Sequence, residues 1–203
     1  MKTLLATALL AASLLAGGCK KDDDVKLNRY TLEPASAVEW WGRKPDGQHH
    51  GAFSVNGQDL LVENGKLKSG TFTIPIASIS NFDLPDEMKP VLLEHLKSAD
   101  FFNAALHPNA TFAITKVGPL TGNRAGSVDG ANYEVSGHFT LLGKTLPLTF
   151  PARITLQNGK LNAEAVLTID RTRWGMTSFS DPAAALYIYP DVDLHLKLSG
   201  TQQ

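Results

Sequence analysis

The pattern of hydrophobic and polar positions predicts a protein built mainly of β-strands. From residue 38 onward, apolar and polar side chains alternate with a period of two, which places them on opposite faces of an extended chain. Val135 and Phe139, for example, fall on one face, and His138 falls on the other. Eight segments carry this alternation: residues 38–41, 51–55, 70–76, 111–117, 133–141, 146–156, 161–169 and 192–198.

Short turn signals separate these segments and indicate how the strands pair. Asn64-Gly65, Leu142-Gly143 and Asn158-Gly159 suit two-residue hairpins, which join neighbouring antiparallel strands. An antiparallel sheet with one packed face and one wet face gives one-sided alternation of this kind. About eight such strands in one domain predict a barrel or a sandwich. Pro147 and Pro151 share one strand and are expected at bends or edge positions.

One segment has the period of a helix instead. Across residues 85–97 the apolar side chains recur every three or four positions, and His95 and Lys97 fall in the last turn. Asp83 is the expected N-cap, and Pro85 suits the first turn. We therefore expect one short amphipathic helix over residues 85–97, placed to cover an end of a barrel.

The first residues resemble the signal of a bacterial lipoprotein. Lys2 is followed by a largely apolar run over residues 4–16, which is long enough for a signal-peptide core and short for a membrane span. Small residues then lead to Cys19, the only cysteine in the sequence. The resemblance implies that residues 1–18 are removed and that Cys19 is lipidated, with acyl chains such as palmitate as a membrane anchor. The alternative is a free thiol in an ordinary secretory signal.

A charged run, residues 20–24, follows the cysteine and has no apolar content. We interpret residues 19–28 as the lipidated cysteine with a solvated tether, and residues 29–200 as one folded domain. The run also resembles the surface-export signal of Bacteroidetes lipoproteins, although a plain spacer fits as well. The expected location is therefore extracytoplasmic, on a membrane facing the periplasm or on the outer membrane or cell surface. Charge is nearly balanced, with 19 Lys and Arg against 20 Asp and Glu, and no basic stripe suggests nucleic acid.

Four stretches resemble, in the right order, the YceI-like family, and together they cover most of residues 30–199. The resemblance implies a lipocalin-like antiparallel up-and-down β-barrel of about eight strands. It also implies binding of a polyisoprenoid or other long amphiphilic lipid in an elongated interior cavity. A histidine–serine pair that is frequent in the family is replaced here by Ala35-Ser36, so that histidine's role does not carry over. The four stretches are YTLEPASAVEWWGRKP (30–45), HLKSADFFNAALHPNATFAI (95–114), SGHFTLLGKTLPLTFPARI (136–154) and LTIDRTRWGM (167–176).

The inward faces of the strands supply the candidate ligand contacts. Burial of an apolar chain contributes about 0.8 kcal/mol per CH₂, so a prenyl or acyl tail needs no charged contact. Alternation by itself favours a solid core filled by these same side chains, whereas the family resemblance favours a cavity. The candidate cavity-lining residues are Trp40, Phe53, Phe72, Ile74, Phe112, Phe139, Phe150 and Leu167.

Two polar groups of residues allow alternative interpretations. Arg171 and Arg173 are candidate contacts for a pyrophosphate or carboxylate head group. A structural clasp is favoured, in which Asp170 pairs with an arginine and Trp174 packs across a barrel end. The adjacent residues His49 and His50 point to opposite faces of a strand, so we expect no metal site, and we expect no cofactor.

The sequence offers little support for an enzyme, because it contains no G-x-S-x-G, H-E-x-x-H or phosphate-binding glycine loop. We therefore expect a lipid-anchored binding protein that sequesters or carries a polyisoprenoid or similar long-chain lipid. The alternative is a solid-core adhesion or structural β-domain that works through its loops. The oligomeric state is left open, with a homodimer among the options.

Overall fold

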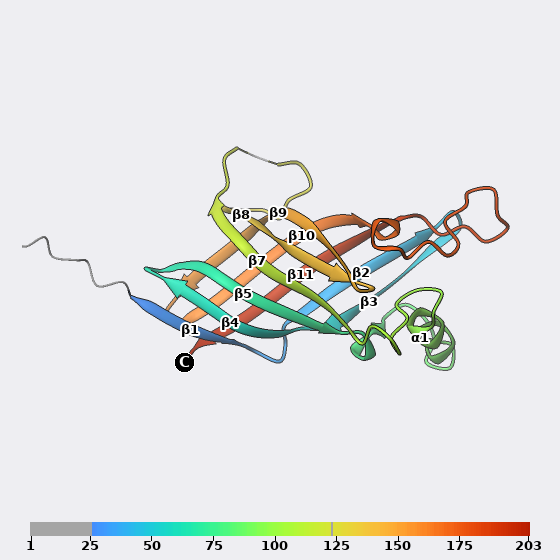
Figure 1. Cartoon of the computed structure of the whole chain (residues 1–203), viewed down its shortest axis with the longest axis horizontal. Helices are drawn as coiled ribbons and strands as arrows, with labels where there is room; N and C mark the ends of the chain where they lie inside the picture. The colour runs from blue at the N-terminus through green and yellow to red at the C-terminus, as the bar shows by residue number, and fades with distance from the viewer. Residues whose placement is uncertain (1–25, 123) are drawn as a thin grey trace, which may run out of the picture.

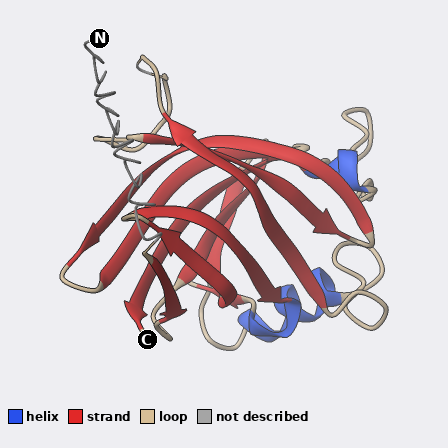
Figure 2. Cartoon of the chain, turned by 60° about the vertical axis from the view of Figure 1, so that its left-hand side comes forward, coloured by secondary structure: helices blue, strands red, loops and turns tan. Residues whose placement is uncertain are grey.

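The chain folds into a closed antiparallel β-barrel (Figures 1 and 2). The computed structural model describes residues 26–122 and 124–203. Around the wall, the strand order is β1-β4-β5-β7-β8-β9-β10-β11, and β11 pairs with β1 to close a ring of eight. The strands are β1 (Leu27–Leu32), β2 (Ala37–Lys44), β3 (Gly47–Ser54), β4 (Asn56–Glu63), β5 (Lys66–Pro75), β6 (Ser80–Asn81), β7 (Asn109–Pro119), β8 (Tyr133–Leu141), β9 (Lys144–Gln157), β10 (Lys160–Asp170) and β11 (Asp191–Gln202).

Two positions in the wall are long strands broken by a bend. β1 continues into β2, and β3 continues into β4, so that β2 and β3 extend the ring beyond β1 and β4. Ser36 holds the first bend, since its buried hydroxyl donates to the carbonyl of Ser199 and accepts from the Ser199 N–H. Its own carbonyl accepts from the N–H of Val55 at the second bend. Ser36 thus ties both bends to β11.

The predicted hairpins are confirmed. Asn64 and Gly65 have φ angles of 50° and 74°, and Asn158 and Gly159 have φ angles of 50° and 72°. Leu142 and Gly143 show the same left-handed pair at 51° and 73°. Two successive positive φ angles are the signature of the type I′ turn, whose twist matches that of the flanking strands.

The wall is split along part of its length, between β9 and β10. β9 pairs with β8 from Lys144 onward but pairs with β10 only over Arg153–Gln157. Pro147 and Pro151 lie in the half of β9 that has one partner, so the missing N–H groups cost no ladder bond, as expected for edge positions. The short 3₁₀-helix η2 (Arg171–Trp174) packs against β9 beside this split.

The helix begins later than the sequence pattern predicts. α1 spans Lys89–Lys97, and turns occupy residues 85–88. Asp83 is not its N-cap, because its carboxylate accepts hydrogen bonds from the His49 side chain and the His50 N–H instead. With both oxygens engaged by β3, Asp83 cannot start a helix. A short 3₁₀-helix, η1 (Ile76–Ser78), precedes β6.

The two ends of the barrel differ, and Figure 1 shows them at the right and left of the view. At the right, which we call the helix end, lie α1, η2, the following segment 175–190 and the β2–β3 hairpin. At the left, the terminal end, β1 begins, β11 finishes, and the loop after β7 lies nearby. In the ranges that the structure covers, no helix is long and apolar enough to cross a membrane.

Candidate ligand-binding cavity

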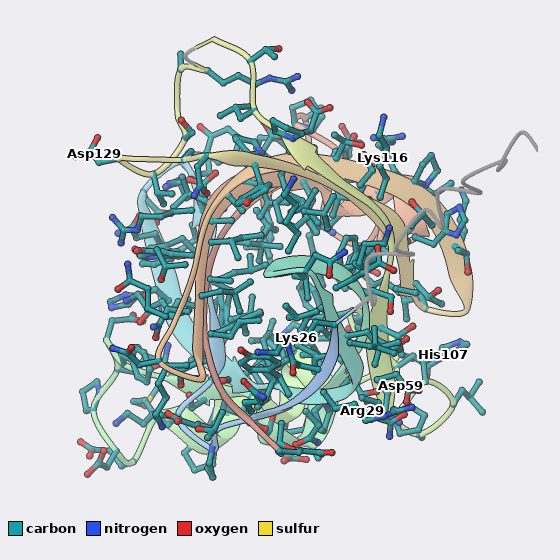
Figure 3. The ribbon with its side chains drawn as sticks, turned by 90° about the vertical axis from the view of Figure 1, so that its left-hand side faces the viewer. Lys26, Arg29, Asp59, His107, Lys116 and Asp129 are labelled. Carbon is teal, nitrogen blue, oxygen red and sulfur yellow. The ribbon has the colours of Figure 1, made fainter. Side chains whose placement is uncertain are left out.

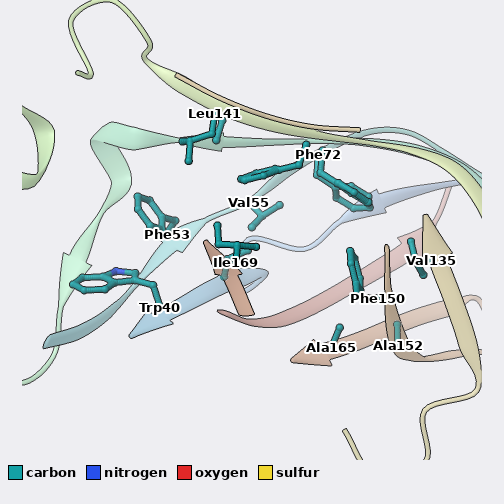
Figure 4. Close-up of a cluster of buried hydrophobic side chains, with 14 of the residues drawn as sticks. Trp40, Phe53, Val55, Phe72, Val135, Leu141, Phe150, Ala152, Ala165 and Ile169 are labelled. Carbon is teal, nitrogen blue, oxygen red and sulfur yellow. The ribbon is translucent and has the colours of Figure 1, made fainter. Parts of the chain in front are cut away.

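The barrel encloses a cavity of about 380 Å³, within the range of roughly 300–1,000 Å³ that is usual for ligand pockets. Its walls are the inward faces of the strands, and Figure 4 shows part of this apolar lining. The structure brings together all eight candidates from the sequence around this space: Trp40, Phe53, Phe72, Ile74, Phe112, Phe139, Phe150 and Leu167. The solid core, the alternative from alternation, is therefore not what the interior contains.

Small side chains keep the interior open. Eight strands enclose just enough room for their own side chains or for one small ligand, so residue size decides which of these occurs. Ala152 and Ala165 face the cavity among larger residues (Figure 4). Phe72, Phe112 and Phe150 form an aromatic cluster in the same lining, with ring centroids 6.4 Å apart for Phe72 and Phe112 and 5.5 Å apart for Phe112 and Phe150. Figure 3 looks along the barrel from the terminal end, where Lys26, Arg29 and Asp59 are labelled.

Residues outside the wall close the helix end of the cavity. Leu92, His95 and Leu96 of α1 line it, as do Leu186 and Ile188 from segment 175–190. Two aromatic contacts join the two covers, because Phe179 lies edge-on to His95 of α1 at 5.7 Å and stacks on Phe101, just after α1, at 5.8 Å. The cavity is thus covered at this end by α1 and segment 175–190.

The ionisable side chains of the lining are mainly basic. Lys44, His49, His95 and Arg171 line the cavity. Arg43 and Glu164 border it, but their side chains lie on the outer face of the wall, where Arg43 pairs with Asp193 and Glu164 pairs with His195. Arg43, Lys44 and His49 come from the β2–β3 hairpin at the helix end. Each has a carboxylate partner that does not line the cavity: Asp193 for Arg43, Asp46 for Lys44 and Asp83 for His49.

Sequence reasoning missed the hairpin cations. Their signal was the position of Arg43-Lys44 at the end of an alternating segment, directly before a turn, which puts both at a barrel rim.

The predicted head-group residues, Arg171 and Arg173, lie elsewhere. Arg171 is buried and donates to the carbonyls of Met176, Ile188 and Tyr189, so three of its five N–H donors are already used. Arg173 does not line the cavity, and its guanidinium lies 5.6 Å from the centre of the Trp174 ring.

The favoured clasp exists, but its partners differ from the prediction. The Asp170 carboxylate accepts from the N–H and hydroxyl of Thr172, at 2.9 and 2.6 Å, and starts η2. Arg171 makes the clasp with backbone carbonyls of segment 175–190 instead. Trp174 packs edge-on against Phe139 at 5.3 Å, with its Nε1 donating to the Phe139 carbonyl.

The histidines do not assemble a metal site. Across residues 26–122 and 124–203, no cluster of three or more His, Cys, Asp or Glu is arranged to hold a metal ion. His49 lines the cavity, while His50 stacks on Trp41 at 6.0 Å, so the two point to opposite faces as expected. His195 lies on the outer face, with Glu164 2.8 Å from its Nε2. Cys19, the predicted lipidation site, lies outside the described residues.

Comparison with known proteins gives one consistent picture. A profile of the YceI-like domain matches residues 30–199. A UPF0312 protein of Pectobacterium atrosepticum is 31% identical over 116 residues, which are 54% of this chain and 53% of the relative. Protein YceI of Escherichia coli O157:H7 is also 31% identical over 116 residues, with the same coverage. The chain thus spans about half the length of the curated relatives that it matches.

Solved structures share the fold. BcnA of Burkholderia cenocepacia superposes with a TM-score of 0.66 at 24% identity, over 84% of this chain and 99% of BcnA. A polyisoprenoid binding domain from Saccharophagus degradans, implicated in plant cell wall breakdown, superposes at 0.63 and 15% identity, over 87% and 99%. The predicted lipocalin-like all-β barrel is confirmed.

Proposed function

The chain belongs to the YceI-like family, and from this premise we propose that it is a carrier that holds the apolar chain of a polyisoprenoid, or of a similar amphiphilic lipid, inside its barrel. It acts by sequestration or carriage, and the ligand leaves chemically unchanged. The S. degradans domain of the same fold is named for polyisoprenoid binding, which supports this class of ligand.

The open apolar cavity is the observation that carries the proposal. A side chain from nearly every strand contributes to it, and its aromatic cluster offers a continuous surface to a flexible chain. Each buried CH₂ contributes about 0.8 kcal/mol, so an isoprene unit of five carbons contributes on the order of 4 kcal/mol when fully enclosed. Burial of the tail alone therefore supplies most of the affinity.

The head group of the ligand belongs at the helix end, beside the β2–β3 hairpin. Lys44 and His49 provide donors there, and their carboxylate partners, Asp46 and Asp83, do not line the cavity. A phosphate or carboxylate reaching this position exchanges one anionic partner for another, which keeps the cost of desolvation small. Arg171 has no role in this proposal, because backbone carbonyls occupy its guanidinium.

The location of the protein is part of the proposal. Lipidation of Cys19 fixes it to a membrane outside the cytoplasm, on the periplasmic side or at the cell surface. The supporting features are the apolar run, the small residues before Cys19 and the charged tether after it. Incubation of growing cells with a radiolabelled fatty acid tests this directly, since a Cys19→Ser chain then carries no label.

Native mass spectrometry tests the ligand. Residues 26–203 contain every strand of the ring and all cavity-lining residues, and a start at Lys26 preserves the pairing of Leu27 with Glu63. We expect a bound long-chain lipid at one molecule per protein, which solvent extraction then identifies. Ala165→Leu fills the cavity and removes the lipid, whereas Ala113→Leu, on the outer face of β7, retains it.

An unliganded mass, followed by failure to bind added prenyl lipids, contradicts the carrier proposal. Equal lipid content in the Ala165→Leu and Ala113→Leu proteins contradicts the placement of the ligand in the barrel. A mass change in the recovered lipid contradicts carriage without chemistry. The adhesion alternative gains nothing from the structure, because it rests on a solid interior and the barrel contains a cavity.

A further inference from the structure

Exposed apolar side chains gather at one end of the molecule. Seven large hydrophobic side chains are exposed among the described residues. Leu27, at the start of β1, is the one that lies at the terminal end. The others come from three segments around the helix end, namely residues 82–91, 106 and 186–189. We call this set the apolar rim: Phe82, Met88, Val91, Leu106, Leu186 and Tyr189.

The helix that covers the cavity carries apolar residues on its outer side as well as beside the cavity. Leu92 and Leu96 line the cavity, whereas Val91 is 66% exposed and Met88, its N-cap, is 49% exposed. The outer side also carries charge, since Glu94 is exposed and pairs with Lys97. Exposed apolar residues next to charged ones are typical of a helix that lies at the surface of a bilayer.

Aromatic residues extend the rim. Phe82 packs edge-on against His50 at 5.9 Å, and His50 stacks on Trp41 at 6.0 Å. On segment 175–190, Tyr187 and Tyr189 pack edge to face at 5.1 Å. Trp and Tyr are the residues that proteins place at the boundary between lipid and water, because their rings combine an apolar body with a polar tip.

We propose that the apolar rim docks on the surface of a lipid bilayer, so that the ligand passes between membrane and cavity without crossing water. This inference rests on the proposed function, since a long apolar chain has its reservoir in a bilayer. Exposing such a chain to water costs about 0.8 kcal/mol per CH₂, which makes passage through solution slow. Arg43 and Lys44 stand at the same end and complement the phosphates of lipid head groups.

The length of the predicted tether limits where a lipid anchor can lie. Six residues lie between Cys19 and Lys26, so the two are at most about 25 Å apart. β9, with 14 residues, runs along the barrel from the helix end to the terminal end, about 35 Å once strand tilt is included. The tether starts at the terminal end and is shorter than the barrel, so a chain anchored through Cys19 docks its rim on a bilayer that faces the one holding the anchor.

Vesicle co-sedimentation of residues 26–203 tests this docking. The vesicles consist of phosphatidylethanolamine and phosphatidylglycerol. The variants replace three rim residues that do not line the cavity, one at a time: Phe82→Gln, Val91→Gln and Leu106→Gln. We expect each substitution to lower partitioning about tenfold, because an inserted apolar side chain is lost. Leu27→Gln is the matched control, since Leu27 is 55% exposed at the other end, and its partitioning stays at the wild-type value.

Binding of an added prenyl lipid, measured on the same proteins by native mass spectrometry, separates the two proposals. Wild-type protein that binds the lipid but ignores vesicles overturns docking and leaves the carrier function standing. Partitioning that depends on the rim, in a protein that binds no added lipid, supports docking and overturns the carrier function. Docking is also overturned if rim and Leu27 variants partition equally, or if the rim instead forms a dimer in sedimentation velocity without vesicles.

Discussion

At the scale of single residues, two buried tryptophans differ in one hydrogen bond. Trp174 is 2% exposed, and its Nε1 donates to the Phe139 carbonyl at 3.1 Å. Trp40 is 7% exposed, and its Nε1 meets no acceptor in the described part of the chain. An unpaired buried donor costs about 1–3 kcal/mol, so the two indoles contribute differently to stability although they bury similar areas.

Replacement by phenylalanine exposes this difference. Trp174→Phe loses a hydrogen bond and leaves the Phe139 carbonyl unpaired, whereas Trp40→Phe removes a donor that had no partner. We expect Trp174→Phe to lower the free energy of unfolding by about 1–3 kcal/mol more than Trp40→Phe does. Urea denaturation followed by circular dichroism measures both, and equal losses would contradict the assignment.

Arg171 gives a second prediction at this scale. Its guanidinium is 3% exposed and holds three carbonyls of the segment that follows η2. Lysine keeps the charge but cannot reach three acceptors in a fork, so Arg171→Lys is expected to cost about 2–4 kcal/mol of stability. Urea denaturation measures this, with the exposed Arg173→Lys as control. Unchanged stability together with weaker lipid binding would restore the head-group role of Arg171.

At the scale of elements, Asp83 joins β3 to the chain that leads into α1. Burial alone would raise the pKa of Asp83, but hydrogen bonds from the His50 N–H, the His49 ring and the Asn81 amide outweigh it and lower the pKa to about 2. In the unfolded chain the pKa is near its ordinary value of 3.8. The folded protein therefore binds this proton less readily than the unfolded chain does.

Asp83→Asn tests this connection. A depressed carboxyl pKa contributes stability that is complete above about pH 4 and is lost as the pH falls towards 2. The difference corresponds to about 2 kcal/mol, and the amide removes it at every pH. We expect the stability gap between wild type and Asp83→Asn at pH 7 to close between pH 4 and pH 2 in urea titrations. A gap that is independent of pH would show that another contact holds the helix.

The elements also show what the sequence could and could not predict. Alternation predicted the strands whose inner faces are regular, as in β8 and β9. It missed β4, because Asp59 has a φ of 51° and the pairing with β5 shifts register after Gln58, which breaks the period of two. It began α1 early, since hydrogen bonds from β3 to Asp83 are tertiary contacts that no local pattern records. β7 runs to Pro119, beyond the end of the predicted segment at residue 117, after a bulge near Ile114.

The same limit applies to the candidate site. Residues such as Phe72 and Phe150 were predictable, because inward positions on a barrel strand necessarily face its interior. Whether the interior was open depended on residue volumes summed over all strands, which alternation does not encode. Whether Arg171 had free donors depended on carbonyls 5 to 18 residues away.

At the scale of the whole molecule, ligand and fold are thermodynamically linked. If the carrier proposal holds, a lipid enclosed by side chains of eight strands binds the folded barrel and not the unfolded chain. At a free concentration of 100 times Kd, it should raise the free energy of unfolding by about 2.7 kcal/mol. Thermal denaturation with and without an added prenyl lipid measures the gain. Ala165→Leu should abolish it and Ala113→Leu should keep it, while an equal gain in both would place the lipid outside the barrel.

The last strand also determines when the barrel can form. β11 pairs with β10 along its length, and its two halves pair with β2 and β1, the first strands of the chain. Tyr30 faces Gln202 across this junction, 172 residues apart in sequence. Contacts between such distant residues form late, because the intervening chain must first be ordered. During synthesis the barrel therefore cannot close prematurely, and it encloses its cavity only after the residues of β11 have emerged.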